Sequence, residues 1–292
     1  MFIQDPPGGF PYIPGGDVSG VVVEADGTSR FKAGAPVVAM FELPRPLNGL
    51  AEFIAVKESL VELASTDIPL VKSSTLTSSA LSAVKAVNEY CCEGDRILVR
   101  GGSGGVGCFL IQLLRSHGAA FIATTSTQRE LMLSLGADMV INYQNENWFD
   151  KNDLLESEKF DLIIDLAVGF DAWQKARQSH LLKISTGKFI AVTSDDALVE
   201  VHNWWQLVTV FVPMQWREIW TKFWPYVPQY IWHNGVDVHP SDLANVTKLV
   251  EDGTMKIVLD PISPLAFTEK GVKQGFTIMQ KRSANGKIVV SM

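Results

Sequence analysis

The sequence predicts an α/β protein in which a doubly wound parallel sheet follows a smaller β-rich unit. Its 292 residues are 47% hydrophobic and 20% charged, which supports a sizeable core and, at about 150 residues per domain, roughly two domains. From residue 75 onward, short apolar strands alternate with helical patterns, whereas the preceding residues show β-branched runs between turns. This composition excludes a disordered chain, a collagen-like repeat and a coiled coil.

The first region contains three candidate strands. They cover residues 18–24, 37–40 and 51–56. Gly20 punctuates the first strand, a Gly-Ala-Pro turn at 34–36 precedes the second, and the third alternates only weakly between apolar and polar residues. Turns every 10–15 residues favour a β-rich unit here.

The middle region alternates strands with helices. Strands are expected at 96–100, 120–124, 139–141, 160–166 and 188–192, and helices at 77–90, 106–116 and 128–135. Gly118 and Gly136 follow two of these helices as C′ residues. Such alternation is typical of βαβ units, and hence of a parallel sheet.

The last region adds two helices and two strands. We expect helices at 241–251 and 270–281 and strands at 256–259 and 286–290. Ser241 is a candidate N-cap for the first helix.

A glycine-rich run connects the strand at 96–100 to the helix that follows it. The run is Gly102, Ser103, Gly104, Gly105, Val106 and Gly107, which matches G-x-G-x-x-G. In that setting glycines permit a tight turn and close approach of a pyrophosphate, while the helix N-terminus supplies N–H groups. The alternative is a structural turn, but the strand–turn–helix context favours a dinucleotide site.

The end of the next strand indicates which dinucleotide binds. An NAD site usually carries Asp or Glu there to bind the ribose 2′-OH, and residues 123–129 contain no acid. They contain Ser126 and Arg129, which suit a 2′-phosphate, so we expect NADPH rather than NADH. Alternatively, Ser126 is only a helix N-cap and Arg129 only a solvated side chain.

Four stretches together resemble a known family. They are 14–22 (Pro-Gly-Gly-Asp-Val-Ser-Gly-Val-Val), 101–107 (Gly-Gly-Ser-Gly-Gly-Val-Gly), 135–143 (Leu-Gly-Ala-Asp-Met-Val-Ile-Asn-Tyr) and 286–290 (Gly-Lys-Ile-Val-Val). They resemble the zinc-free, quinone-oxidoreductase-like (ζ-crystallin-like) branch of the medium-chain dehydrogenase/reductase superfamily. The resemblance covers nearly the whole chain.

The resemblance implies two domains with a cleft between them. A GroES-like catalytic domain would take residues 1–82 and 256–292, and a Rossmann-type cofactor domain residues 83–255. Further strands normally precede the entry strand in this family, so we expect the GroES-like domain to be incomplete at its N-terminus. The implied activity is hydride transfer from NADPH to a quinone or an α,β-unsaturated carbonyl.

The resemblance also implies roles for individual residues. Ser126, Arg129 and Tyr143 fall where the 2′-phosphate is held, and Ser82 falls near the nicotinamide. Asn285 and Lys287 fall in a loop that reaches the cofactor.

The sequence lacks the usual zinc ligands. Where zinc-dependent relatives carry Gly-His-Glu, residues 15–17 are Gly-Gly-Asp. Three cysteines cannot form a four-cysteine structural site, and the five histidines show no ligand spacing. We therefore expect no metal. We assign no catalytic residue: Asp17 is a candidate by position, but a turn-stabilising carboxylate explains it as well.

A tryptophan-rich segment spans residues 204–232. It contains Trp204, Trp205, Trp216, Trp220, Trp224 and Trp232, six of the eight tryptophans. Because residues 216, 220 and 224 share one helical face, they could form a core-facing stripe, a dimer interface or substrate lid, or a peripheral membrane anchor.

The remaining expectations concern partners and location. A net charge of −7 argues against nucleic-acid binding, and no segment is long and apolar enough to suggest a membrane span. We expect a cytoplasmic homodimer or monomer that acts on a small apolar, quinone or enone substrate. The rival hypothesis is a catalytically weak NADPH-binding protein that acts as a sensor, sorting factor or partner-binding protein.

Overall fold

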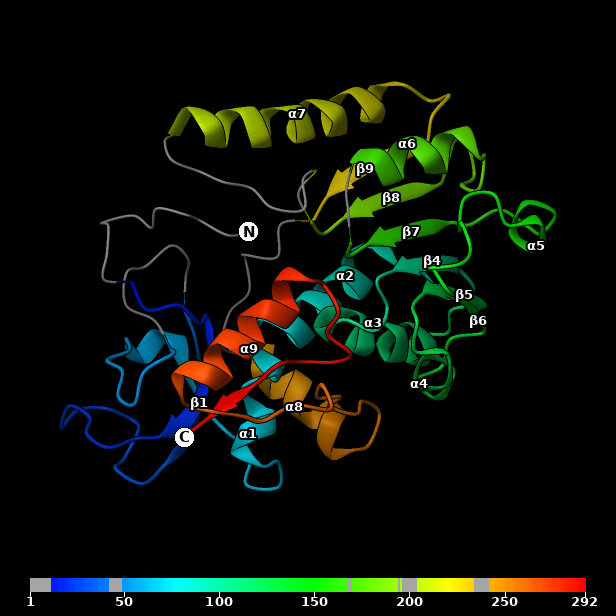
Figure 1. The fold of residues 1–292 in the computed structure, drawn as a ribbon. Helices are drawn as coiled ribbons and strands as arrows, with labels where there is room; N and C mark the ends of the chain where they lie inside the picture. The colour runs from blue at the N-terminus through cyan, green and yellow to red at the C-terminus, as the bar shows by residue number, and fades with distance from the viewer. Residues whose placement is uncertain (1–11, 42–48, 168–169, 194, 196–203, 234–241) are drawn as a thin grey trace. The chain divides into compact units, whose positions relative to one another are not determined.

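The structure is a computed structural model that describes residues 12–41, 49–167, 170–193, 195, 204–233 and 242–292. Contacts divide the chain into two compact units (Figure 1). Of the described residues, those from 86 to 233 form one unit, and residues 12–85 and 242–292 form the other. Each unit is described by itself.

The first unit is built on a six-stranded parallel sheet of order β6-β5-β4-β7-β8-β9. The strands are β4 (Arg96–Arg100), β5 (Phe121–Thr125), β6 (Met139–Ile141), β7 (Leu162–Asp165), β8 (Lys188–Ala191) and β9 (Gln229–Trp232). This is the doubly wound order, with its switch point between β4 and β7. The predicted α/β class with a Rossmann-type sheet is confirmed.

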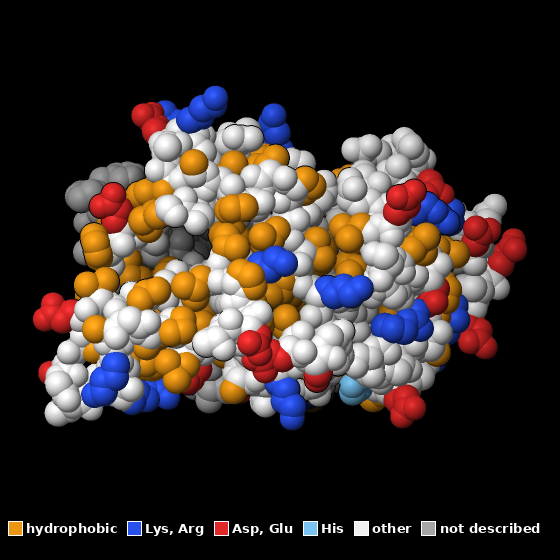
Figure 2. All heavy atoms as spheres, turned by 90° about the horizontal axis from the view of Figure 1, so that it is seen from below, with side chains coloured by type: hydrophobic (Ala, Val, Ile, Leu, Met, Phe, Trp, Pro, Cys, Tyr) orange, Lys and Arg blue, Asp and Glu red, His pale blue; other side chains and the backbone are white. Residues whose placement is uncertain are grey.

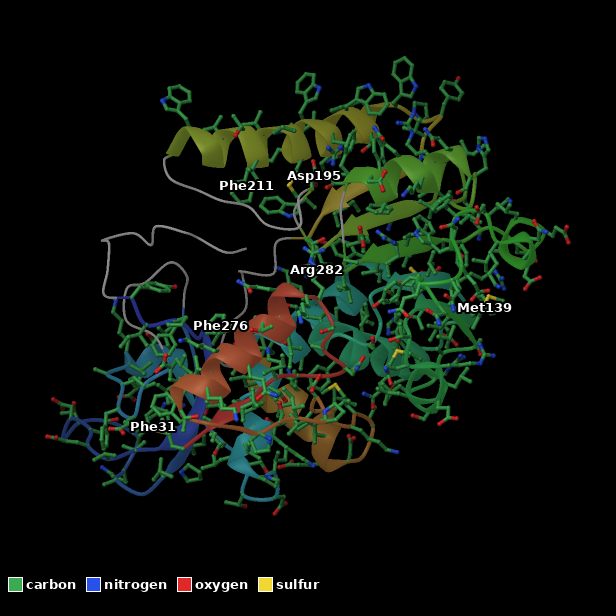
Figure 3. The ribbon with its side chains drawn as sticks, in the orientation of Figure 1. Phe31, Met139, Asp195, Phe211, Phe276 and Arg282 are labelled. Atoms are coloured by element: carbon green, nitrogen blue, oxygen red, sulfur yellow. The ribbon has the colours of Figure 1, made fainter. Side chains whose placement is uncertain are left out.

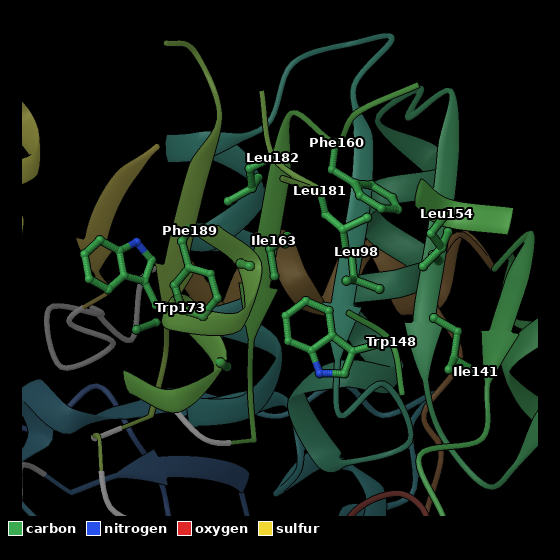
Figure 4. Packing of buried hydrophobic residues seen from close by; sticks show 14 of the residues in the cluster. Leu98, Ile141, Trp148, Leu154, Phe160, Ile163, Trp173, Leu181, Leu182 and Phe189 are labelled. Carbon is green, nitrogen blue, oxygen red and sulfur yellow. The ribbon is translucent and has the colours of Figure 1, made fainter. Parts of the chain in front are cut away.

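The central strands carry apolar side chains on both faces, which explains why they form a parallel sheet that is buried on both sides. Ile97, Leu98 and Val99 of β4 are all fully buried, as expected for a strand covered on both sides. One face packs on a cluster that includes Trp148, Phe160 and other large side chains (Figure 4).

Helices connect these strands. They are α3 (Gly105–Ser116), α4 (Arg129–Ser134), α5 (Asn152–Leu155), α6 (Phe170–Gln178) and α7 (Trp204–Phe223), and α2 (Leu81–Tyr90) leads into the unit. Of these, α7 lies in the tryptophan-rich segment and packs against β9. Strand β9, at the sheet edge, was not predicted from the sequence.

The second unit is β-rich. Strands β1 (Asp17–Val21), β2 (Pro36–Met40) and β3 (Val61–Leu63) form an antiparallel sheet, and β10 (Leu265–Ala266) pairs in parallel with β11 (Val290–Ser291). Its helices are η1 (Glu58–Leu60), α1 (Leu70–Ser73), η2 (Leu76–Ala80), α8 (Leu243–Glu251) and α9 (Glu269–Gln280). The C-terminal segment therefore joins the β-rich unit.

This unit contains a large hollow with mostly apolar walls. Its volume is about 1270 Å³, and β1, β2, residues 49–56, α9 and the C-terminal residues line it. Figure 2 shows one face of the molecule, on which hydrophobic side chains gather in the left part of the view.

Several predicted elements differ from the structure. Residues 51–56 form no strand, and Phe53 is exposed, since their weak alternation defines no buried face. Residues 256–259 contribute only an isolated bridge, Leu259 to Lys287. The proposed cap Ser241 lies outside the described residues, and α8 begins after Asp242.

The predicted domain bounds stay a prediction; in the division by contacts, the described residues 242–255 group with the β-rich unit. Helix α8 packs on η2, and Glu251 accepts a hydrogen bond from Ser65.

The stripe at 216, 220 and 224 is not part of the core. Trp216 and Trp224 are exposed and Trp220 is partly exposed, whereas Met214 and Arg217 face inward. The core-facing interpretation of these tryptophans is therefore wrong. The side chain of Trp204 lies outside the described part of the helix. In the described residues, no helix is long and apolar enough to cross a membrane.

Candidate functional site

The glycine-rich loop lies at the carboxyl end of β4, where it is held by β5. The Gly101 N–H donates to Thr125 Oγ1 (2.9 Å), and the Gly102 N–H donates to the Thr125 carbonyl (3.2 Å). Gly101 has φ +82°, a left-handed conformation that glycine adopts without strain. The sequence motif did not include Gly101, and it gave no reason to expect the contribution of Thr125.

The three motif glycines have different environments. A Cβ at Gly102 would lie 2.1 Å from Thr124 Oγ1, and one at Gly107 would lie 2.5 Å from the carbonyl oxygens of Gly101 and Gly102. At Gly104 the nearest atom would be 3.5 Å away. Packing therefore requires Gly102 and Gly107, whereas a Cβ at Gly104 would make only an ordinary van der Waals contact.

The N-terminus of α3 completes the loop. Gly104 is its N-cap, without a capping side chain, and the first helical bond runs from the Cys108 N–H to the Gly104 carbonyl (3.0 Å). The N–H groups of Gly105, Val106 and Gly107 precede that bond, so they have no intrahelical acceptor. Together with the helix dipole, they form a site suited to a pyrophosphate. Ser103 is buried beside them.

Ser126 and Arg129 lie where β5 ends. Ser126 is buried; its N–H donates to the Ile141 carbonyl (3.0 Å), and its Oγ accepts from the Gln128 N–H (2.9 Å). Ser126 thus stabilises a turn before α4, whose N-cap is Gln128. Arg129 is exposed and donates to the Val140 carbonyl (3.3 Å).

The neighbouring strand β6 brings further groups to this corner. Tyr143 follows β6 and is 52% exposed, so its ring is available to a ligand. Glu146 pairs with Lys151 and accepts from the Asn142 N–H (3.1 Å). The hydrogen bond from Lys151, and then that from Asn142, lower the pKa of Glu146, and the charge of Arg129 adds to this effect.

Arg129 and Lys151 therefore share one acidic neighbour. Sequence reasoning missed Lys151 and Glu146, because neither belongs to a motif and 22 positions separate the two cations. The strand order places the ends of β5 and β6 side by side, which brings these charges to one corner.

Lys287 has a different setting in the second unit. Its Nζ donates to Asp17 Oδ2 (2.9 Å) and Ser79 Oγ (2.6 Å), and Ser78 donates to Asp17 from both its N–H and its Oγ. Burial by itself raises the pKa of Asp17, but the charge of Lys287 and these hydrogen bonds outweigh it and hold the pKa below the usual value of an aspartate.

The other two residues assigned by resemblance lie outside this network. Ser82 is half-buried in the first turn of α2, and the Asn285 N–H donates to Asp260 Oδ2 (2.8 Å). Their assignment to the cofactor stays a prediction.

The donor set does not fit a metal. Among the described residues, no group of three or more His, Cys, Asp and Glu side chains is placed to hold an ion. Cys91, Cys92 and Cys108 are free, and burial raises the pKa of the Cys91 and Cys108 thiols to about 12.

With this geometry established, comparison with known proteins decides the family. Residues 135–290 match the family model described as zinc-binding dehydrogenase. The chain belongs to this family. Within it, relatives place the chain in the quinone-oxidoreductase-like branch of the medium-chain dehydrogenases/reductases, as predicted.

Two relatives are similar along most of the chain. The chloroplastic NADPH-dependent alkenal/one oxidoreductase of Arabidopsis thaliana is 31% identical over 96% of this chain and 64% of that protein. The mitochondrial NAD(P)H oxidoreductase RTN4IP1 of Bos taurus is also 31% identical, over 97% of this chain and 71% of its own length.

A solved structure shares the fold. The quinone oxidoreductase of Escherichia coli, complexed with NADPH, aligns with a TM-score of 0.75 at 18% identity, over 98% of this chain and 84% of that chain. The chain thus spans less than two thirds of the length of the Arabidopsis relative, and more than two thirds of the Bos taurus relative and of the Escherichia coli structure. The family name mentions zinc, but the described side chains provide no ligand set for it.

Proposed function

We propose that this chain is an NADPH-dependent oxidoreductase that transfers a hydride to a quinone or an α,β-unsaturated carbonyl. The observation that carries the proposal is the loop at the N-terminus of α3, whose first N–H groups lack helical acceptors and whose Gly104 would meet no atom closer than 3.5 Å if it carried a Cβ. The names of the relatives support it, since they include an NADPH-dependent alkenal/one oxidoreductase and a quinone oxidoreductase complexed with NADPH.

The described residues would divide the binding of NADPH between two groups. The loop from Gly101 to Gly107 would hold the pyrophosphate through backbone N–H groups. Ser126, Arg129 and Tyr143 would hold the 2′-phosphate, with Lys151 as a second cation. Residues 123–129 at the end of β5 contain no acid to bind a ribose 2′-OH, and Arg129 with the nearby Lys151 supplies positive charge, which favours NADPH over NADH.

NADPH held by these residues would supply the hydride that reduces the conjugated double bond of an enone, with a proton completing the saturated product. Each turnover consumes one NADPH and one proton and leaves a saturated ketone. The apolar hollow of the β-rich unit is suited to a small apolar acceptor. Zinc independence is part of the proposal, because Gly16 stands where a zinc-ligating histidine would be and no alternative ligand set is described.

Absorbance at 340 nm tests this function directly. The purified chain is mixed with NADPH and a panel of quinones and α,β-unsaturated carbonyls, with the matching saturated ketones as controls. We expect NADPH consumption with unsaturated acceptors only, and slower consumption with NADH. Background rates across the panel, in a protein shown to bind NADPH, would refute catalysis and favour the rival role as a sensor or sorting factor.

Location remains a separate proposal. A cytoplasmic protein is the expectation from the sequence, whereas the names of two relatives place them in chloroplasts or mitochondria. Subcellular fractionation with antibody detection would decide between these compartments.

A further inference from the structure

A charged pair lies in the wall of the apolar hollow of the β-rich unit. Figure 3 labels two aromatic residues of this wall, Phe31 and Phe276 on α9. Asp17 and Lys287 line the same hollow, and their side chains remain 16% and 22% exposed. Of the described residues in this wall, Lys287 is the only lysine or arginine. It is therefore the charged hydrogen-bond donor that a ligand in the hollow meets.

The backbone fixes Lys287 from both sides. Its N–H donates to the Val258 carbonyl (3.0 Å), and its carbonyl accepts from the Asp260 N–H (2.9 Å). The preceding Gly286 has φ +110°, and a Cβ there would lie 2.7 Å from the Val258 carbonyl oxygen. This close passage of two segments holds the start of the lysine side chain in one place.

The ammonium group of Lys287 uses two of its three N–H donors within the protein. Nζ donates to Asp17 Oδ2 (2.9 Å) and to Oγ of the buried Ser79 (2.6 Å). No further acceptor for this group exists among the described residues. The third N–H is therefore available to a ligand in the hollow.

The acidic partner decides which ligand suits this donor. Although burial raises the pKa of Asp17, the charge of Lys287 and the hydrogen bonds lower it below its usual value, so the carboxylate is charged at neutral pH. A neighbouring carboxylate keeps the lysine protonated, but its charge weakens the binding of a full anion. The pair therefore suits a neutral carbonyl oxygen on which negative charge develops only during a reaction.

Reduction of a conjugated acceptor produces such a charge. When the double bond of an enone is reduced, an electron pair moves onto the carbonyl oxygen until a proton from water completes the saturated ketone. A donor held against this oxygen interacts more strongly with the developing charge than with the neutral carbonyl, which lowers the barrier.

We propose that Lys287, held by Asp17 and Ser79, donates a hydrogen bond to the carbonyl oxygen of the acceptor in the apolar hollow and stabilises the negative charge that develops there. This inference rests on the proposed function, since it concerns the acceptor of that reaction. It assigns Lys287 to the acceptor rather than to the cofactor, where the resemblance places it. The ligand class is an uncharged carbonyl compound with an apolar body.

Binding of 4-nitrophenol in the absence of NADPH tests the assignment. The phenolate form of this probe absorbs visible light and carries a charged oxygen, whereas the neutral form does not. An apolar hollow alone would raise the pKa of the bound probe, but a cation against its oxygen would lower it. We expect a lowered pKa in the wild type, and Lys287→Met should weaken phenolate binding at least about 10-fold.

Three further variants separate this role from a purely structural one. Asp17→Asn removes the opposing charge, so it should bind the phenolate at least as tightly as the wild type despite a loss of stability. The double variant Asp17→Asn with Lys287→Met leaves no uncompensated buried charge and should bind the phenolate as weakly as Lys287→Met, even if that single variant fails to fold. Lys273→Met is the matched control, because Lys273 pairs with Glu269, is 74% exposed and lies outside the lining of the hollow.

Four results would overturn the proposal. They are no binding of the probe, a raised pKa of the bound probe in the wild type, unchanged phenolate affinity without Lys287, and a loss of NADPH affinity in Lys287→Met, which would assign the lysine to the cofactor. Turnover is measured separately, and Lys287→Met should lower kcat/KM for an enone by about 100-fold. A chain that binds the phenolate but reduces no acceptor would refute the proposed function and leave the carbonyl site standing.

Discussion

Replacing Gly104 with alanine should separate cofactor binding from folding. The backbone at Gly104 has φ −74° and ψ 172°, which any residue adopts, and an added Cβ would come no closer than 3.5 Å to another atom. As N-cap of α3, an alanine is slightly worse than glycine, but it gains from a less flexible unfolded chain. We therefore expect a change in unfolding free energy within about 0.5 kcal/mol.

The same methyl group should weaken NADPH binding. The methyl group would stand beside the N–H groups that would hold the pyrophosphate, so the ligand must move away from at least one of them. A hydrogen bond to a charged group contributes about 1.5–3 kcal/mol, and losing one raises the Kd by roughly 10- to 150-fold.

Gly107→Ala is the matched comparison. Its Cβ would lie 2.5 Å from two backbone carbonyl oxygens, which cannot rotate away as a side chain can. Over-packing of this kind costs about 1–3 kcal/mol. At about 2–4 °C per kcal/mol, the melting temperature should fall by about 2–12 °C.

Calorimetric melting and fluorescence titration with NADPH measure both effects. Gly104→Ala should melt with the wild type and bind weakly, while Gly107→Ala should be impaired in both measurements. Wild-type affinity in Gly104→Ala would refute the reasoning, because the loop would then tolerate a side chain where the pyrophosphate is expected.

Three further predictions concern charge. Arg129→Ala should raise the Kd for NADPH about 5- to 30-fold, because an exposed charged contact is worth about 1–2 kcal/mol. The Kd for NADH should change by less than twofold. Equal loss of affinity for both cofactors, measured by titration, would contradict this prediction. Glu146→Gln removes the negative charge beside Arg129 and Lys151, so the Kd for NADPH should fall about 2- to 5-fold in a titration. An unchanged or higher Kd would argue against binding of the 2′-phosphate beside these residues. Asp17→Asn should lower the unfolding free energy by about 2–3 kcal/mol near pH 7. Because Lys287 lowers the pKa of Asp17 in the folded chain, urea unfolding should show this gap constant above about pH 4 and shrinking only as the pH falls through the lowered pKa. A gap that already shrinks between pH 7 and pH 5 would count against the Lys287 pair.

The sheet was predictable because its local patterns agree with its tertiary environment. Runs such as Ile97 to Val99 are apolar on both faces, which is how parallel strands covered by helices appear in sequence. Edge strand β9 was missed because Gln229 to Trp232 lies in an aromatic segment whose helical spacing dominated the pattern.

The residues at the ends of β5 and β6, where the 2′-phosphate is expected to bind, were only partly predictable. Ser126 and Arg129 follow a strand directly, so their place at the carboxyl edge is fixed by chain order. Lys151 and Glu146 reach that corner through a loop after β6, which no periodicity describes. Helix α7 shows the reverse failure, because helical spacing predicts one apolar face but does not say whether that face turns inward. The buried Arg217, which pairs with Asp195, decides the orientation, so Trp216 is exposed.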